Sequence, residues 1–233
     1  MMAPLVVFDL DGTLVDTAPD LVAALNVVFA NEGLRPVTYA AARNLVGGGA
    51  RAMIERGLDT AGRKLASAQV DRMVADFIAY YAAHIADESQ PFPGLTDALE
   101  TLASEGCLLA VCTNKLERLA ARLLDELDLS RRFVAICGAD TFGVQKPHPE
   151  LLRRTIALAK GRDSAAVMVG DSATDIAMAR AAGVPVVAVD FGYSEVPVGQ
   201  FAPDRVISTL NELRDAVFAL APRTPGPTRL VRS

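Results

Sequence analysis

The sequence predicts an α/β protein with a doubly wound, mainly parallel sheet and an inserted α-helical cap domain. Three observations support this prediction. Short apolar runs alternate with longer segments of helical periodicity, the runs lack polar–apolar alternation, and a long helical stretch separates the first run from the second. Runs that are apolar throughout are typical of strands buried on both faces of a parallel sheet. We expect right-handed crossovers to join them.

The expected strands are short runs rich in Val, Ile, Leu and Ala. In chain order they span residues 4–8, 107–112, 133–137, 166–169, 184–189 and, more weakly, 205–207. The helices expected between them span residues 95–105, 116–127, 149–160, 172–182 and 209–221. Gly106, Gly161 and Gly183 follow three of these helices. Glycine is favoured there because it adopts the left-handed conformation of a helix end.

Residues 17–90 interrupt this alternation. Apolar residues recur near helical spacing in residues 21–30, 39–46, 50–58 and 67–85, and no strand pattern is evident among them. A block of this size is too long for a loop in a compact domain. We therefore expect an α/β core formed by residues 1–16 and 91–222, a helical cap formed by residues 17–90 with its return linker at residues 91–94, and a disordered tail at residues 223–233.

The composition excludes several classes of protein. The 233 residues include 23 Lys and Arg against 28 Asp and Glu, with 51% hydrophobic content, which is typical of a globular protein. A mildly acidic chain is poorly suited to nucleic acid. No run approaches the roughly 20 apolar residues that span a bilayer, and the N-terminus lacks the pattern of a signal peptide. We expect a cytoplasmic protein without a membrane partner; its oligomeric state is not predicted.

The three cysteines, Cys107, Cys112 and Cys137, lie in or beside apolar runs and lack metal-binding spacing. We expect them to be buried reduced thiols.

Four polar clusters follow predicted strands, at the sheet edge where open parallel sheets bind ligands. They are Asp9-Leu10-Asp11-Gly12-Thr13, Thr113-Asn114-Lys115, Lys146-Pro147-His148-Pro149 and Gly170-Asp171-Ser172-Ala173-Thr174-Asp175. Each has a purely structural interpretation, such as a helix cap or a surface lysine. Their common position favours joint action.

The acidic residues indicate a divalent cation. Asp9 and Asp11 are two residues apart, so an extended backbone would turn both carboxylates the same way. Asp171 and Asp175 are four apart, which predicts a shared helix face. Neighbouring carboxylates repel unless a cation lies between them, and Mg²⁺ prefers such oxygen ligands.

The remaining polar residues are suited to a phosphoryl group. Thr113 and Asn114 offer uncharged donors, although either could instead cap the next helix. Lys146, placed just before a helix that begins near Pro149, offers a point charge. We interpret His148 as a helix-start residue rather than a base. Together the clusters suit Mg²⁺-assisted phosphoryl transfer, with one carboxylate as nucleophile and a second as general acid and base.

FDLDGTL, TN, KP and GDSATD, in this order, resemble the four motifs of the haloacid-dehalogenase-like (HAD) phosphohydrolases. The resemblance implies a HAD-like Rossmannoid core with a helical cap inserted after the first motif. It also implies that Asp9 is the nucleophile and a Mg²⁺ ligand, and that Asp11 is the general acid and base and binds the metal through its backbone carbonyl. By the same resemblance, Thr113, Asn114 and Lys146 bind phosphate, Asp171 binds the metal, and Asp175 supports the metal shell.

Two further stretches are similar to phosphoglycolate phosphatases: residues 44–51, which contain Gly47-Gly48-Gly49, and residues 191–194 followed by Pro203-Asp204. The resemblance makes Gly48 and Arg51 candidates for substrate specificity. A guanidinium suits a substrate carboxylate, while a solvated helix-start residue is the alternative interpretation of Arg51.

The main hypothesis is therefore a Mg²⁺-dependent phosphatase that hydrolyses 2-phosphoglycolate through an aspartyl-phosphate. A sugar-phosphate mutase similar to β-phosphoglucomutase and a phosphatase or pyrophosphatase for another small substrate are the alternatives. A phospho-acceptor module of the receiver type is a third interpretation, which the helical insertion and the DLDGT order disfavour.

Overall fold

The computed structural model of the protein describes residues 4–161 and 165–221. Its main sheet has six strands in the order β5-β4-β1-β6-β7-β8, and every pairing is parallel. The strands are β1 (Leu5–Phe8), β4 (Leu108–Cys112), β5 (Ala135–Cys137), β6 (Ala166–Gly170), β7 (Val186–Val189) and β8 (Arg205–Ile207). All six predicted strands are confirmed, and the order reverses direction at β1, as a doubly wound sheet requires.

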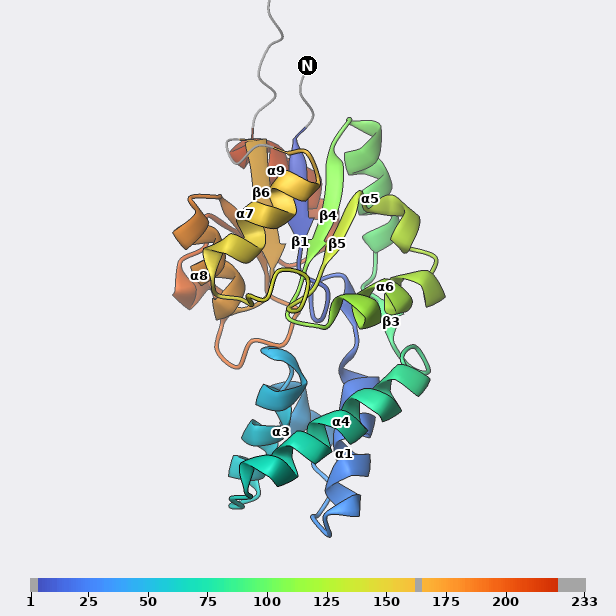
Figure 1. The fold of residues 1–233 in the computed structure, drawn as a ribbon. Helices are drawn as coiled ribbons and strands as arrows, with labels where there is room; N and C mark the ends of the chain where they lie inside the picture. Colours follow the sequence, from blue (N-terminus) through green and yellow to red (C-terminus); the bar gives the residue numbers. More distant parts are fainter. Residues whose placement is uncertain (1–3, 162–164, 222–233) are drawn as a thin grey trace, which may run out of the picture.

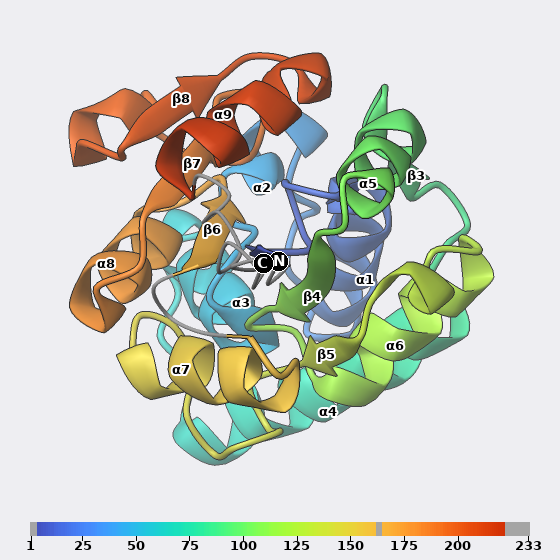
Figure 2. The same ribbon diagram turned by 90° about the horizontal axis from the view of Figure 1, so that it is seen from above.

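Helices cover both faces of this sheet (Figures 1 and 2). Leu5 and Val7 of β1 pack with α7 (Pro149–Leu158) and α8 (Ala173–Ala182). Val6 and Phe8 point to the other face, which α5 (Leu95–Ser104), α6 (Glu117–Glu126) and α9 (Leu213–Leu220) cover. All four β1 side chains are fully buried, which explains why this strand shows no polar–apolar alternation.

Helices α1–α4 lie together beyond the carboxyl ends of the strands (Figure 1). They are α1 (Ala18–Asn31), α2 (Tyr39–Arg43), α3 (Gly49–Thr60) and α4 (Ser67–Ala83). Gly57 of α3 lies against Phe29 of α1, where a Cβ atom would be 2.8 Å from the Phe29 ring. The missing side chain therefore lets α1 and α3 approach closely. The predicted helical character of this segment is confirmed, whereas its role as a separate cap stays a prediction.

Two very short strands connect this segment to the sheet. β2 (Val15–Asp16) pairs antiparallel with β3 (Gln90–Pro91). The sequence interpretation, which placed no strand up to residue 90 and a linker after it, is wrong here because two residues are too few to show a period. Asp20, which is buried near the start of α1, links this helix to the residues just before β3. Its carboxylate accepts hydrogen bonds from the backbone N–H groups of Glu88 and Ser89 and from the Ser89 hydroxyl.

The remaining sequence predictions are partly confirmed by the structure. The last predicted helix is divided into a 3₁₀ turn (Leu210–Glu212) and α9. All three cysteines are free and buried, as predicted. The predicted tail, residues 223–233, lies outside the described residues. Among the helices of the described residues, none combines the length and apolar character needed to cross a bilayer.

Candidate active site

The register of the three central strands brings distant polar residues to one edge. Phe8 lies opposite both Val111 of β4 and Val169 of β6. The strands therefore end at the same level, and the loops that follow them carry Asp9, Thr113 and Asp171. Parallel strands make this convergence unavoidable, because their carboxyl ends share one edge.

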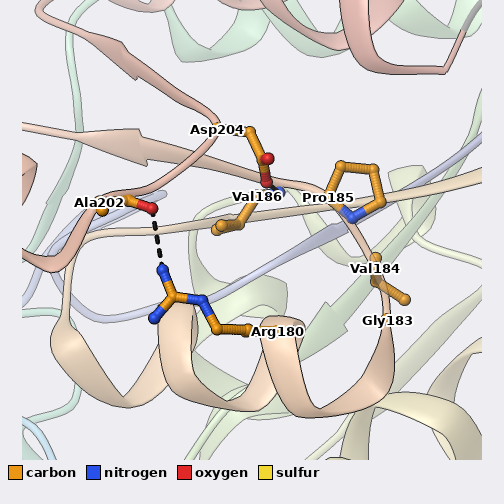
Figure 3. Close-up of a pocket in the computed structure, with 7 residues that line it drawn as sticks. All are labelled: Arg180, Gly183, Val184, Pro185, Val186, Ala202 and Asp204. Carbon is orange, nitrogen blue, oxygen red and sulfur yellow. Dashed lines mark hydrogen bonds between the residues drawn. The ribbon is translucent and has the colours of Figure 1, made fainter.

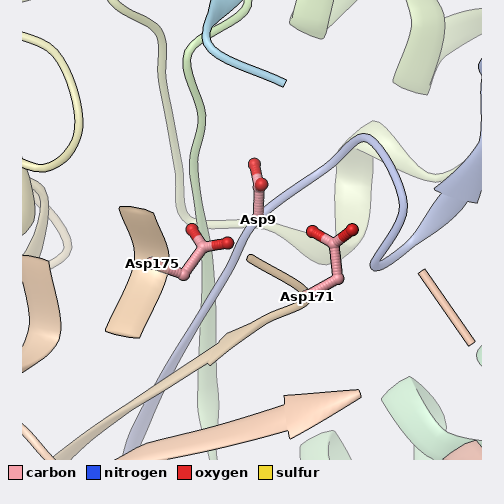
Figure 4. Close-up of side chains that lie close together, drawn as sticks. All are labelled: Asp9, Asp171 and Asp175. Atoms are coloured by element: carbon pink, nitrogen blue, oxygen red, sulfur yellow. The ribbon is translucent and has the colours of Figure 1, made fainter. Parts of the chain in front are cut away.

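Asp9, Asp171 and Asp175 form an acidic group at this edge (Figure 4). One ligand oxygen from each lies within 4.8 Å of the others. Lys146 completes the group, because its buried Nζ lies 2.7 Å from an oxygen of Asp9 and 2.7 Å from an oxygen of Asp175. Three of the four sequence clusters therefore meet in one place, as predicted.

Burial and repulsion oppose ionisation of two of these acids. Burial raises the pKa of Asp9 to about 6, against the attraction of Lys146 and with a further contribution from Asp175. Burial, followed by the charges of Asp175 and Asp9, raises the pKa of Asp171 well above its usual range. Burial lowers the pKa of Lys146, but Asp175 and Asp9 outweigh it, and the net shift is upward. The lysine therefore stays charged.

The donor set fits a hard divalent cation. Asp9, Asp171 and Asp175 supply three carboxylates, whereas Lys146 supplies one ammonium group. The ionised set thus keeps two negative charges in a largely buried space. Oxygen-only ligands at this spacing are those that Mg²⁺ and similar ions prefer.

A loop after β7 holds Asp171 in place. The backbone N–H of Tyr193 donates to Asp171 Oδ2 at 2.7 Å. Gly12 and Gly192 enclose the same side chain so closely that a Cβ atom at either position would collide with it. The Tyr193 hydroxyl donates to Asp16 at 2.6 Å, so Tyr193 also contacts β2, the short strand that precedes α1.

Asp171 and Asp175 come together for a reason other than the predicted one. Asp171 precedes α8 and is not helical, so the two acids do not share a helix face. Ser172 is the N-cap, and Asp175 completes a capping box by accepting from the Ser172 backbone N–H at 3.1 Å. This helix start turns the other Asp175 oxygen toward Lys146. Asp175 thus both caps α8 and holds the lysine.

Asp11 belongs to a different contact from Asp9. Its Oδ1 accepts from Lys115 Nζ and from Thr17 Oγ1, each at 2.7 Å. The two carboxylates therefore have separate lysine partners, and the Asp11 side chain is not among the three acids of the group. Metal binding through the Asp11 backbone carbonyl stays a prediction.

The second and third clusters are linked through Asn114. Its Oδ1 accepts from the backbone N–H of Lys146 at 2.8 Å, so Asn114 fixes the loop that carries the lysine. Thr113 is buried at the end of β4 and accepts from the Lys115 N–H at 3.2 Å. His148 is the N-cap of α7 and accepts from the Glu150 N–H, which confirms its predicted structural role. Phosphate binding by Thr113, Asn114 and Lys146 stays a prediction.

The glycine run reaches the site, whereas the Arg51 side chain pairs elsewhere. A Cβ atom on Gly49 would be 3.3 Å from the Asn114 carbonyl oxygen, and Gly48, with φ +79°, is the N-cap of α3. Arg51, in the first turn of α3, is exposed and pairs with Glu55 and Asp71. The first turn of α3 therefore lies beside the second cluster. Specificity roles for Gly48 and Arg51 stay predictions.

A separate cavity of about 330 Å³ lies at the opposite end of α8 (Figure 3). Arg180 and Asp204 line it together with residues 183–186 and Ala202. Arg180 donates to the carbonyls of Phe201 and Ala202, and Asp204 accepts from the Val186 N–H. These polar groups hold the local chain, and the cavity is not part of the acidic site.

Sequence reasoning assigned no role to four residues that contact the site: Arg43, Tyr81, Lys115 and Tyr193. Arg43 of α2 donates to the carbonyls of Phe191 and Gly192 at 2.8 and 2.7 Å and so braces the loop around Asp171. For Lys115, the one available signal was its place in the polar cluster that follows the predicted strand 107–112. Tyr193 lies in the stretch 191–194 already noted in the sequence, whereas the contacts of Arg43 and Tyr81 depend on how loops and helices pack.

Comparisons with known proteins agree with this geometry. Residues 6–189 match the haloacid dehalogenase-like hydrolase family. Curated relatives include proteins named phosphoglycolate phosphatase from Mesorhizobium japonicum, 48% identical over 91% of this chain and 94% of that protein, and from Caulobacter vibrioides, 47% identical over 95% and 94%. A solved structure described as a predicted phosphoglycolate phosphatase, from Haemophilus somnus, superposes with a TM-score of 0.84 at 26% identity over 92% of this chain and 97% of that one. The chain therefore belongs to the haloacid dehalogenase-like hydrolases.

Proposed function

We propose that this protein is a Mg²⁺-dependent phosphatase that hydrolyses 2-phosphoglycolate to glycolate and phosphate. The convergence of Asp9, Asp171 and Asp175 with Lys146 carries the proposal. The names of the curated relatives support the choice of substrate. We further propose that residues 17–90 form a cap over this edge of the core.

In the proposed reaction, an oxygen of Asp9 attacks phosphorus and forms an aspartyl-phosphate while the bond to the alkoxide oxygen breaks. Asp11, acting as the general acid, gives a proton to that alkoxide, which leaves as the alcohol. Asp11 then takes a proton from water as the water attacks the aspartyl-phosphate, and this step releases phosphate and restores Asp9. Lys146 offsets phosphate charge beside Asp9. A bound Mg²⁺, held by Asp9 and Asp171, would supply further charge neutralisation.

A panel of phosphate compounds tests the proposal directly. Phosphate release is measured with 2-phosphoglycolate, p-nitrophenyl phosphate, β-glucose 1-phosphate and pyrophosphate, each with Mg²⁺, with Ca²⁺ and with EDTA. We expect the highest kcat/KM with 2-phosphoglycolate and Mg²⁺, and loss of activity in EDTA. Conversion of β-glucose 1-phosphate to glucose 6-phosphate without phosphate release would instead establish the mutase alternative.

Arg51→Ala tests the proposed recognition of the substrate carboxylate. Exposed ion pairs contribute little to stability, so Arg51 can exchange Glu55 and Asp71 for a substrate. We expect kcat/KM for 2-phosphoglycolate to fall at least about tenfold, as for one lost charge-assisted contact, with p-nitrophenyl phosphate unaffected. Asp71→Asn is the matched control, because it removes the same ion pair and keeps the arginine. Equal losses on both substrates, or in both variants, would remove the specificity role.

A further inference from the structure

Lys115, Tyr81 and Asp11 form a contact that the acidic group does not include. Lys115 Nζ donates to Asp11 Oδ1 at 2.7 Å and to the Tyr81 hydroxyl at 3.0 Å. The same Nζ lies 4.5 Å from the centre of the Tyr81 ring. The Lys115 side chain is 5% exposed and Tyr81 is 1% exposed. Water is thus largely excluded from this contact.

The contact holds Asp11 through one oxygen only. Both hydrogen bonds that residues 4–161 and 165–221 donate to this carboxylate, from Lys115 and from Thr17, reach Oδ1. Two donors on one oxygen restrict rotation of the carboxylate, and the bond from the ammonium is the stronger kind. Oδ2 is therefore the oxygen that remains to exchange a proton with a substrate.

Tyr81 belongs to α4, whereas Lys115 follows β4 and Asp11 follows β1. The contact therefore joins the helical segment to two loops of the core. Burial lowers the pKa of Lys115, but the charge of Asp11 and the neighbouring Tyr81 outweigh it, and the net shift is upward. Lys115 stays an ammonium and can keep both partners.

We propose that Lys115 is a positioning residue that orients Asp11 for proton exchange, and that Tyr81 holds Lys115 in place when the helical segment packs on the core. The inference rests on the proposed function, in which Asp11 protonates the leaving alkoxide. An ion pair that only stabilises the fold would affect every substrate equally. A positioning role lowers kcat/KM, which reports formation of the aspartyl-phosphate, for those substrates whose leaving group needs a proton; the later attack of water is common to all substrates and does not enter kcat/KM.

The choice of substrate separates these two roles. The alkoxide of 2-phosphoglycolate needs a proton to leave, whereas p-nitrophenolate leaves without one. General acid–base catalysis contributes about 10²–10⁴-fold. For Lys115→Met we expect kcat/KM for 2-phosphoglycolate to fall about 10²-fold, through kcat rather than KM, and kcat/KM for p-nitrophenyl phosphate to fall less than about tenfold. Lys115→Arg, which keeps the charge, should recover part of the loss.

A second pair of variants keeps the test valid if Lys115→Met folds poorly. Tyr81→Phe removes the hydroxyl and keeps the ring, and we expect a smaller loss with the same substrate pattern. Tyr80→Phe, the neighbouring tyrosine of α4, is the matched control and should match the parent. In an Asp11→Asn background, Lys115→Met should cause no further loss with 2-phosphoglycolate, because residues that act as one unit are not additive.

Equal losses on the two substrates, or an additive effect in the Asp11→Asn background, would overturn the inference and leave the proposed function standing. If the parent enzyme does not hydrolyse 2-phosphoglycolate, the proposed function fails instead. The comparison is then made with phenyl phosphate, whose phenolate is a poorer leaving group, against p-nitrophenyl phosphate. The two failures are therefore distinguishable.

Discussion

Asp9→Asn is expected to abolish turnover while the protein stays folded. The amide cannot attack phosphorus, so we expect kcat to fall by at least about 10⁴-fold with every phosphate ester, as when other covalent nucleophiles are removed. Asn has nearly the same shape, and Lys146 keeps Asp175 as a partner at 2.7 Å. The substitution also removes one of several carboxylates that repel one another. Burial already disfavours the ionised form of Asp9, so its loss should not destabilise the fold. Phosphate release and circular dichroism measure the two outcomes.

Asp97→Asn is the matched control, because it makes the same exchange at an exposed position in the first turn of α5. It should retain full activity. Acid quenching of the parent enzyme during turnover, followed by mass spectrometry, should locate a phosphoryl group on Asp9. Activity near the parent level in Asp9→Asn, or a phosphoryl group on another residue, would contradict the proposed role.

Asp171→Asn is expected to weaken metal binding while the protein stays folded. Its carboxylate is one of three in the acidic group, and loss of a ligand weakens metal binding at least as strongly as loss of a supporting residue. We expect the Mg²⁺ concentration for half-maximal activity to rise by about 10–100-fold or more. Magnesium should also lose most of its effect on Tm, because stabilisation by a ligand depends on its affinity.

Without metal, Asp171→Asn should leave the folded protein as stable as the parent or make it more stable. The raised pKa of Asp171 means that burial and its acidic neighbours disfavour its ionised form in the folded protein. At neutral pH a neutral Asn removes this penalty and keeps an oxygen that can accept from the Tyr193 N–H. In EDTA we therefore expect Tm equal to or above that of the parent. An unchanged Mg²⁺ response would count against the ligand role of Asp171.

The sheet and the edge that carries the site could be predicted because an apolar run marks a buried strand and the polar residues after the run mark its carboxyl end. Each residue of Leu5–Phe8 is apolar since both faces of β1 are covered, and the polar cluster that follows it begins where that burial ends. Thr113 and Asp171 follow the same rule at β4 and β6. Strand order was not needed to expect that these residues meet.

Interpretations that depended on local geometry were less successful. The spacing of Asp171 and Asp175 indicated a shared helix face, but the helix starts only after Ser172. The short ribbon of β2 and β3 left no period to detect. In both cases the conformation of the chain depends on hydrogen bonds between particular residues, and the type of a single residue does not specify those bonds.

Lys115 shows the limit most clearly. In sequence it is a polar residue after an apolar strand, and nothing there distinguishes a surface lysine from one held by Asp11 and Tyr81. The sequence by itself determined which side chains reach the catalytic edge, because hydrophobic periodicity sets where each buried strand ends. Only the tertiary structure decided which lysine meets which carboxylate. Such pairing depends on distances of a few ångströms between segments that are 29 residues apart for Lys146 and Asp175 and 104 apart for Lys115 and Asp11, and it is set by how loops and helices pack.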